Sequence, residues 1–438
     1  MKKLTALILI IFICTGLFSC MPNLKKFAIR FADEKIDVGA DDLKNEDYLA
    51  FMEKLDVFSS KLSADIYKKY GSNQNLCISP ISVYMSLAIA CENADGETRE
   101  EILNALGVTY EELSAFTKYI YAERNKEYKY VNSVGKESTS ASEQLSNSIW
   151  LADDLLYNKS YIDRLASNYN CDVFGVSFKD KTARDIINQY IEYKSNGIIS
   201  SDISFGKNTP FSIISVYVLQ EIWSDIGRGL PTTFDSYDFI DSDGSVSETQ
   251  LLRGHYSNGQ IYSTEKYSSF FIETEHGYKL HFIVPTEEYK LKDVFTFQTI
   301  SEILALDDYG HIDDENGEIH FTRVLFPPFS TSFNADISSF LSEKYGIERL
   351  FDPELCDFSN LLSSPAHCEA LIHKSQLNIK SSGIDCEVIY VDSNTPVSPD
   401  LPEYNEVYHE MIIGGAFGFV LTDESGTILY SGVINNLN

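Results

Sequence analysis

The side chains that could carry catalysis in this chain of 438 residues are its eight histidines and its 65 carboxylates. His409-Glu410 begins like the His-Glu-x-x-His helix of zinc proteases, but Ile413 stands where the second histidine is required. The carboxylates are too numerous for one pair to be singled out as general acid and base. The sequence contains no Gly-x-Ser-x-Gly elbow and no phosphate-binding or dinucleotide glycine pattern. We therefore expect a protein that is not an enzyme and uses no cofactor.

Histidine and cysteine spacing also predicts no metal site. His276 and His281 lie five residues apart across an apparent hairpin turn, and we interpret them as surface residues rather than as a metal pair. The cysteines are scattered singly, with no Cys-x-x-Cys pair and no disulfide-scaffold density. Cys77 and Cys91 lie in apolar runs and are most simply small buried side chains. The disulfide state of the remaining cysteines stays open.

Cys20 is the one cysteine for which the sequence predicts a function, because it ends a segment typical of exported lipoproteins. Lys2 and Lys3 form a basic start, and an apolar run over 4–18 is shorter than the roughly 20 residues of a membrane-spanning helix. The run closes with Leu-Phe-Ser-Cys, which resembles a bacterial lipoprotein cleavage box. We expect a signal peptide over 1–20, lipid attachment at Cys20, and an extracellular or cell-surface protein anchored to the bacterial membrane by lipid. Plain secretion is the alternative.

The charge balance limits the partners. Thirty-five basic against 65 acidic residues give a net charge of −30, which disfavours a sequence-independent nucleic-acid binder. Loss of Lys2 and Lys3 with the signal changes the balance to 33 − 65 = −32, which also disfavours a polyanionic activator. The apolar fraction of 44% is that of an ordinary globular protein. We expect a soluble surface and a monomer.

Hydrophobic periodicity then predicts the elements. Residues 21–47 are polar and mixed, and we interpret them as a tether. Apolar residues at helical spacing predict a helix over 48–70, and a second helix begins at Ser79-Pro80, where the Ser79 side chain is expected to accept from backbone N–H groups. Residues 123–144 are rich in Lys, Glu and Ser and predict an exposed helix or insertion.

The rest of the chain alternates irregularly between strands and helices. Strands are predicted over 148–151, 211–219, 270–274, 279–284, 319–326, 370–379 and 417–421, and helices over 100–106, 161–169, 182–193 and 337–345. Because no regular strand–helix–strand rhythm appears, we expect an α+β fold. No internal repeat or linker follows residue 48, so we expect one large domain over 48–438.

The segment NLCISPISVYMSLAIACENADGETREEILNALG, residues 75–107, resembles the first long signature of the serpin family. In that signature an Asn, a Ser-Pro helix start and a Gly-x-Thr turn recur in this order and spacing. The matching positions are Asn75, Ser79, Pro80, Ser82, Leu87, Gly96, Thr98 and Leu106.

The resemblance continues in family order to the end of the chain, over about 390 residues. The segment INQYI contains Asn188, and a strand-like run ends at Trp223 as in the family. LIHKSQLNI contains His373, which we interpret as a structural hydrogen-bonding residue, with pH sensing as the alternative. The closing segment FGFVLTDESGTILYSGVIN contains Gly432.

This resemblance implies the serpin fold, a large central mixed sheet with surrounding helices and an exposed reactive-centre loop. It also implies that the protein inhibits extracellular serine-type endopeptidases as a suicide substrate. In the family, the protease cuts the loop and is held as an acyl-enzyme, and the freed loop inserts into the main sheet as an extra strand. No catalytic residue of the inhibitor is needed.

The hinge that must enter the sheet first departs from the family pattern. The family usually has short side chains here, whereas this chain has Gly383, Ile384, Asp385, Cys386, Glu387 and Val388. The glycine is kept, but bulk at the following positions slows insertion, and slow insertion lets a protease escape. Against this, the apolar residues alternate as in a half-buried strand, and residues 384–395 contain no proline. A permanent strand would show the same alternation.

Counting about fifteen residues from the hinge glycine places the scissile bond between Val397 and Ser398. Valine before the cut suits an elastase-like pocket. The chain contains no Lys or Arg after Lys380, so a trypsin-like target is not expected. The predicted partners are extracellular serine proteases of elastase-like or subtilisin-like specificity, with papain-like cysteine proteases as a further class. The alternative hypothesis, based on the bulky hinge, is a non-inhibitory serpin-fold binding or structural module at the cell surface.

Overall fold

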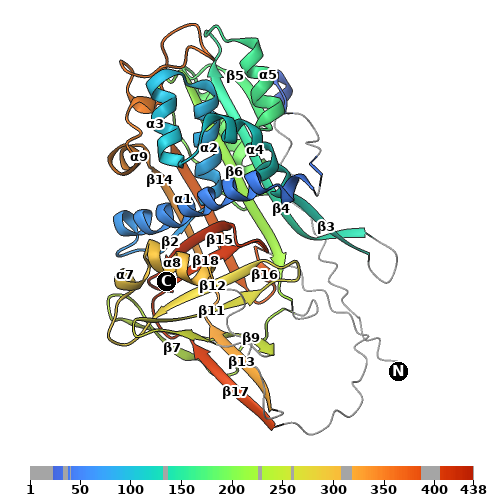
Figure 1. Cartoon of the computed structure of the whole chain (residues 1–438), viewed down its shortest axis with the longest axis vertical. Helices are drawn as coiled ribbons and strands as arrows, with labels where there is room; N and C mark the ends of the chain where they lie inside the picture. The colour runs from blue at the N-terminus through green and yellow to red at the C-terminus, as the bar shows by residue number, and fades with distance from the viewer. Residues whose placement is uncertain are drawn as a thin grey trace, which may run out of the picture.

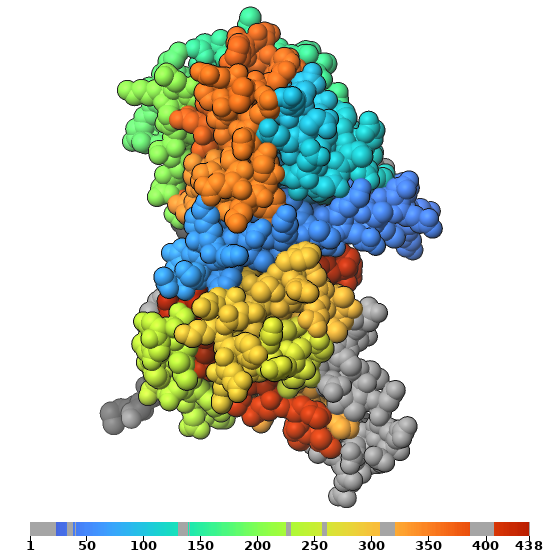
Figure 2. All heavy atoms as spheres, turned by 60° about the vertical axis from the view of Figure 1, so that its left-hand side comes forward, coloured from blue at the N-terminus to red at the C-terminus, as the bar shows by residue number. Residues whose placement is uncertain are grey.

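The computed structural model describes residues 23–32, 38–39, 41–131, 137–224, 229–257, 261–306, 318–385 and 405–437. These residues form an elongated molecule in which most of the helices gather at one end of a large mixed sheet, and the smaller sheets lie with α7 and α8 at the other (Figure 1). In Figure 2 the long helix α1 crosses the waist between the two ends. The predicted α+β class is confirmed.

The main sheet has eight strands among the described residues, in the order β1-β5-β4-β6-β16-β15-β14, with β3 paired to β4. Their bounds are β1 (Ala28–Arg30), β3 (Asn125–Val131), β4 (Glu137–Ala152), β5 (Cys171–Val176), β6 (Phe211–Ile222), β14 (Phe329–Asp336), β15 (Ile372–Lys380) and β16 (Gly383–Ile384). β16 is antiparallel to both of its neighbours, so β6 and β15 run in the same direction. β1 lies within the residues expected to form a tether and pairs with β5 at the edge of the sheet.

The other sheets are smaller. A six-stranded sheet follows the order β10 (Tyr262–Ser263), β11 (Tyr267–Glu273), β12 (Lys279–Pro285), β18 (Phe417–Thr422), β19 (Ile428–Ile434) and β2 (Leu76–Ile78). A three-stranded sheet follows the order β17 (Asn405–Ile412), β13 (Glu318–Phe326) and β9 (Leu252–Ser257), and β7 (Tyr237–Ile240) pairs with β8 (Val246–Thr249).

The helices of the described residues are α1 (Glu46–Tyr70), α2 (Pro80–Asn93), α3 (Gly96–Leu106), α4 (Tyr110–Glu123), α5 (Lys159–Asn168), α6 (Lys181–Lys194), α7 (Leu291–Val294), α8 (Phe297–Leu304) and α9 (Ser338–Tyr345). Every residue of α2 is buried, and its mostly apolar sequence is typical of a helix enclosed on all sides. No helix of the described residues is long and apolar enough to cross a membrane.

The two faces of the main sheet pack against different layers. Leu377, Ile379 and Ile384 belong to a large core shared with the six-stranded sheet and α1. Trp150 and Val216 face the other way, into a second core formed with α6 and the linker that follows it. Because side chains alternate along a strand, any strand added between β6 and β15 would be buried on both faces.

Most of the predicted elements are confirmed, with two corrections. Residues 123–144 do not form a helix: α4 ends at Glu123, and β3 and β4 form a long hairpin. The composition misled because exposed strands and exposed helices both carry Lys, Glu and Ser. Ser79 precedes α2 as expected, but its side chain makes no capping hydrogen bond; its hydroxyl accepts from that of Ser82 at 3.1 Å.

Candidate functional site

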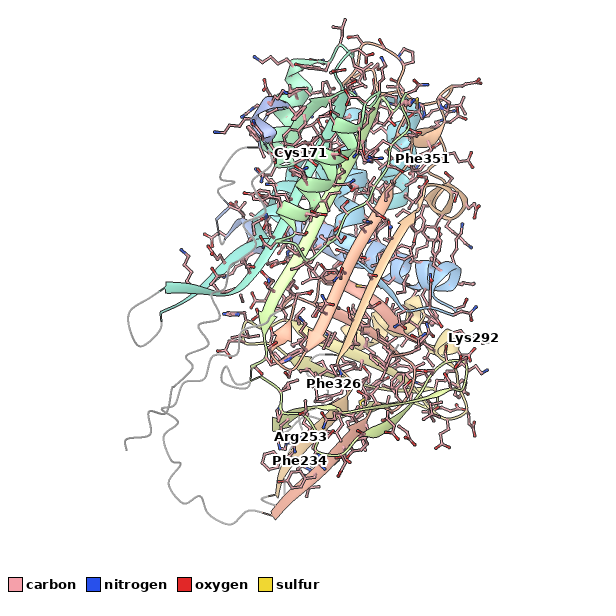
Figure 3. The ribbon with its side chains drawn as sticks, turned by 180° about the vertical axis from the view of Figure 1, so that it is seen from behind. Cys171, Phe234, Arg253, Lys292, Phe326 and Phe351 are labelled. Atoms are coloured by element: carbon pink, nitrogen blue, oxygen red, sulfur yellow. The ribbon has the colours of Figure 1, made fainter. Side chains whose placement is uncertain are left out.

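The candidate site is the boundary between β6 and β15. These two long strands lie side by side in the main sheet, with only the short strand β16 between them (Figure 3). At one end of this boundary the two-residue strand β16 lies between them, with Ile384 opposite both Glu221 and Ile379. At the other end an isolated bridge joins Phe211 to Cys368. Among the described residues, no ladder pair joins β6 directly to β15 between these two points. We call this stretch the β6–β15 boundary.

Gly383 is required for β16 to enter the sheet. Its φ of +151° lies in a region that other residues rarely adopt. A Cβ atom at this position would lie 1.9 Å from the carbonyl oxygen of Glu221 and 3.0 Å from the Cα of Ile222. Both are backbone atoms of β6, so neither can move without displacing the strand. The glycine of the predicted hinge is therefore explained by close backbone contact.

The two residues after Gly383 show where the chain leaves the sheet. The Ile384 side chain is fully buried in the core that the main and six-stranded sheets share. Asp385 has a φ of +46°, and its backbone N–H donates to the Asn378 carbonyl at 2.8 Å. The Asp385 carboxylate accepts from the side chain and the backbone N–H of Asn378, and the Gln220 amide donates to the Asp385 carbonyl at 3.1 Å. Burial raises the pKa of Asp385 to about 6.

A second titratable group lies on the opposite side of β16. Glu221 is fully buried, and both of its carboxylate oxygens lie 2.9 Å from Nδ1 of His276. Burial raises the pKa of Glu221 to about 8, and burial also lowers the pKa of His276. The ring of Tyr128, on the β3–β4 hairpin, stacks on His276 with centroids 3.6 Å apart. The hairpin thus covers the end of the sheet where β16 enters.

Trp223 and His373 each connect one of the two strands to a neighbouring segment by a hydrogen bond to its backbone. The Trp223 indole N–H donates to the Lys380 carbonyl at 2.8 Å, which ties the end of β6 to the end of β15. His373 is buried, and its Nε2 accepts from the backbone N–H of Ser79 at 3.2 Å. Burial lowers the pKa of His373 to about 4, so the imidazole is neutral and acts as an acceptor. This geometry supports the structural interpretation of His373.

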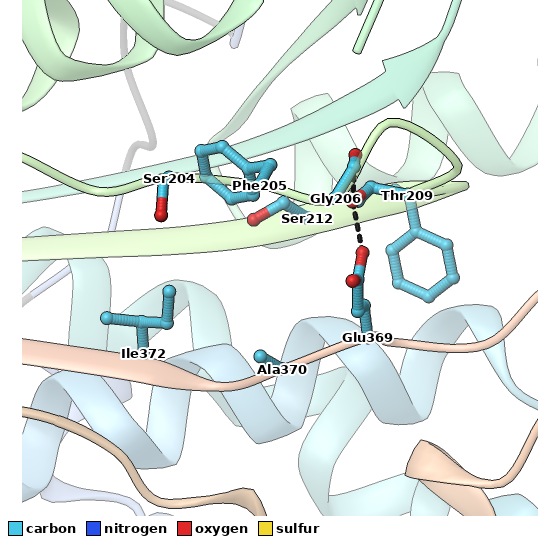
Figure 4. Close-up of a pocket in the computed structure, with 9 residues that line it drawn as sticks. Ser204, Phe205, Gly206, Thr209, Ser212, Glu369, Ala370 and Ile372 are labelled. Atoms are coloured by element: carbon cyan, nitrogen blue, oxygen red, sulfur yellow. Dashed lines mark hydrogen bonds between the residues drawn. The ribbon is translucent and has the colours of Figure 1, made fainter. Parts of the chain in front are cut away.

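The far end of the β6–β15 boundary contains a small pocket of about 70 Å³ (Figure 4). Phe211 and Ser212 of β6 line one side, and Glu369 and Ile372 line the other. The Thr209 hydroxyl donates to the Glu369 carboxylate across the pocket. The segments that lead into the two strands are therefore joined here by this side-chain contact and by the single Phe211–Cys368 bridge.

A linker crosses the same boundary on the α6 side. Lys374 of β15 donates to the Asp202 carboxylate at 2.6 Å and to the Ser200 carbonyl at 3.1 Å. Asn188 of α6 holds the same linker, because its side chain accepts from the Ile203 N–H at 2.9 Å and donates to the Ile203 carbonyl at 3.0 Å. An added strand at this level would have to displace the linker or pass beneath it.

A family model described as "Serpin (serine protease inhibitor)" matches residues 53–437. The chain belongs to the serpin family. Members of this family are protease inhibitors rather than enzymes, and the serpin fold predicted from the motifs is confirmed.

Relatives and solved structures agree on the fold. An uncharacterized serpin-like protein of Methanosarcina acetivorans is 22% identical over 407 residues, covering 86% of this chain and 84% of its own. Human neuroserpin is 20% identical, covering 85% and 89%. The crystal structure of the thermophilic serpin tengpin in its native state has a TM-score of 0.69 at 18% identity, covering 95% of this chain and 99% of its own. Human thyroxine-binding globulin complexed with its ligand has a TM-score of 0.70 at 16% identity, covering 90% and 100%.

The remaining serpin-motif residues lie in structural positions. Asn75 accepts from the N–H of Asn435 at 2.7 Å and thereby fixes the C-terminus. Thr98 accepts from the N–H of Asp357 at 2.9 Å, following Gly96 at the start of α3. A Cβ on Gly432 would lie 1.9 Å from the carbonyl oxygen of Leu76, so β19 and β2 require a glycine there.

Several predicted residues lie outside the described residues. They are the lipid-attachment residue Cys20, the hinge residues Cys386, Glu387 and Val388, and the scissile pair Val397 and Ser398. The predictions for them stay predictions.

Sequence reasoning missed the group of Tyr128, Glu221 and His276. The spacing predicts both His276 and His281 as surface residues, and this prediction is wrong for His281, which is buried in β12. A contact between residues 55 positions apart gives no sign in local spacing.

Proposed function

We propose that this serpin inhibits extracellular serine proteases as a suicide substrate, by inserting its cut loop along the β6–β15 boundary. The observation that carries the proposal is β16, which occupies the entrance between β6 and β15 with only two residues. Ile384 is already buried there, and the chain turns out of the sheet at Asp385. A hinge at the first step of insertion would occupy this position.

Continuing the register of β16 gives the length of strand that the sheet can accept. Ile384 lies opposite Glu221 in an antiparallel pair. Counting forward from Ile384 and backward from Glu221 therefore places Asn394 opposite Phe211, the first residue of β6. On the other side the same count places Asn394 opposite Glu369, at the pocket that ends the boundary. The first proline after Gly383 is residue 396, so no proline falls within this length.

The inserted side chains would match the two cores. The register places Cys386 between Leu219 and Leu377, which both face the large core. It places Val391 on the opposite face, between Ile214 and Ile372 in the α6 core. Both faces of an inserted strand would thus be apolar, which favours the run Val-Ile-Tyr-Val over residues 388–391. Asp385, Glu387 and Asp392 are the charged exceptions within this length, and burying them would slow insertion.

Insertion after cleavage would displace the bound protease while it is an acyl-enzyme. The protease's serine would replace the amide nitrogen of residue 398 on the carbonyl carbon of Val397, and the new amine would leave with the C-terminal part of the chain. Movement of the acyl group with the inserting strand would distort the protease before water could hydrolyse the ester. Elastase-like and subtilisin-like enzymes are the proposed targets, and papain-like cysteine proteases would form the corresponding thioester.

Denaturing gels test the proposal. The chain from residue 21 is incubated with elastase or subtilisin, and an SDS-resistant band heavier than either partner is expected. Mass spectrometry of the released C-terminal peptide identifies the cut bond. Cleavage in the loop with no heavy band would contradict inhibition by trapping.

The second candidate is a non-inhibitory serpin that binds a ligand or partner at the cell surface. The bulk of Ile384, Cys386 and Val388 favours it, and corticosteroid-binding globulin of Oryctolagus cuniculus is 31% identical over 147 residues, 33% of this chain and 36% of its own. The triple variant I384T/C386A/V388A, which restores short side chains to the hinge, distinguishes the two candidates. If only the variant traps protease, the native hinge is non-inhibitory.

We further propose that the protein is exported and anchored by lipid at Cys20, which supports an extracellular protease as the target. Expression in a bacterium fed a radioactive fatty acid should label the full chain. Cys20→Ser should abolish the label, and Cys77→Ser should leave it unchanged.

A further inference from the structure

The three-stranded sheet contains a pair of histidines that neither the serpin fold nor the proposed function uses. His320 lies on β13 and His409 on β17, and the two strands are parallel neighbours. Nδ1 of His320 lies 3.1 Å from Nε2 of His409, and the rings are nearly parallel, with an interplanar angle of 14°. The pair brings together residues 89 positions apart.

The register explains why these two side chains meet. Thr322 lies opposite His409, and His320 precedes Thr322 by two residues, so all three share one face of the sheet. His255 of β9 lies opposite Arg323 and therefore projects from the other face, where it is exposed. The meeting of His320 and His409 is thus fixed by the pairing of the backbones.

The separation of the two nitrogens fits a shared metal ion. An imidazole nitrogen binds zinc at about 2.0–2.1 Å, and two such bonds spanning 3.1 Å enclose an angle of about 98° at the ion. That angle lies between the right angle of octahedral coordination and the tetrahedral angle. Imidazole ligands suit zinc, copper and nickel ions rather than calcium or magnesium.

We propose that His320 and His409 form a two-histidine site for a divalent transition-metal ion, with zinc as the ion to be tested. Among the described residues, no group of three or more His, Cys, Asp or Glu side chains is placed to hold a metal ion, so water would complete the coordination. The inference does not depend on the proposed function.

The site would join β17 to β13, its neighbour in this sheet among the described residues. β17 lies at the sheet edge and pairs with β13 from Asn405 to Ile412. Asn405 begins the strand that follows the loop, so a bound ion would hold the point where the loop rejoins the fold. Binding to the folded chain alone raises its stability.

The test uses the chain from residue 21 without a histidine tag. Zinc is titrated by calorimetry into the wild type, His320→Gln, His409→Gln and the control His255→Gln, and thermal midpoints are measured with zinc and with EDTA. We expect the wild type and H255Q to bind an ion and to gain in thermal midpoint, and H320Q and H409Q each to lose both effects while keeping the wild-type midpoint in EDTA.

Any of three results would overturn the site: no zinc binding by the wild type, zinc binding by a folded single variant equal to that of the wild type, or a zinc-dependent rise in midpoint that persists in such a variant. The two single variants are independent, so if one is unstable in EDTA the other decides the question. A zinc-dependent rise in midpoint that persists in the folded variant would place the ion elsewhere. In that case the contact is a hydrogen bond between imidazoles.

Discussion

Asp385 gives the hinge a pH dependence whose size follows from its burial. Burial raises the pKa of this carboxyl from 3.8 to about 6, and at 1.36 kcal/mol per pKa unit this corresponds to about 3 kcal/mol. Because the folded-state pKa is the higher one, the charged form is disfavoured in the folded chain. Stability contributed by this group is therefore greatest below about pH 4 and is lost as the pH rises through 6.

The Asp385→Asn variant isolates this contribution, because an amide stays neutral at every pH. Between pH 7.5 and pH 4.5 the wild type should gain about 2 kcal/mol relative to the variant. For a domain of this size that is a relative shift of about 2–3 °C in the thermal midpoint, measured by circular dichroism. Asp154→Asn, at an exposed carboxylate, serves as the control. A constant offset between wild type and D385N over this range would refute a buried, hydrogen-bonded Asp385.

Two further variants test a buried ion-pair cluster and the linker that crosses the β6–β15 boundary. Arg124 is buried between Glu143 and Asp423, so Arg124→Met leaves two buried carboxylates without a partner cation. The variant should lower the free energy of unfolding, measured in urea, by about 3–5 kcal/mol. A loss smaller than about 1 kcal/mol would contradict the buried ion pairs. Lys374→Met releases the linker that crosses the boundary, so it should speed protease trapping in stopped-flow assays, with a change in stability below about 1 kcal/mol. The control Lys179→Met, at an exposed ion pair, should change neither the trapping rate nor the stability. Equal trapping rates for Lys374→Met and the wild type would show that the linker does not limit insertion.

The fold could be predicted because its signals are local and ordered along the chain. Residues 75–107 carry a complete motif, and the apolar positions of α1 keep helical spacing over about seven turns. The hairpin of β3 and β4 was missed because an exposed strand buries little. The alternation of Tyr128 with charged neighbours is the signal that would have favoured a strand over a helix.

The site could be predicted only in part. Gly383 was recognised from its motif, but the reason for it lies in the backbone of Glu221, which is far away in sequence. The contact of Glu221 with His276, and the pairing of His320 with His409, depend on the register of strands that come together only in the fold. Local spacing carries no information about such register, because it is set by packing across the whole sheet.

Hydrogen exchange before and after loop cleavage tests the central claim most directly. The chain is cut in its loop by a protease that it does not trap, and amide exchange is followed in 212–220 of β6 and 372–378 of β15. If the cut loop inserts, exchange in both segments slows and the thermal midpoint rises strongly, because both strands gain a ladder partner. Unchanged exchange in both segments and an unchanged midpoint would contradict insertion along the β6–β15 boundary.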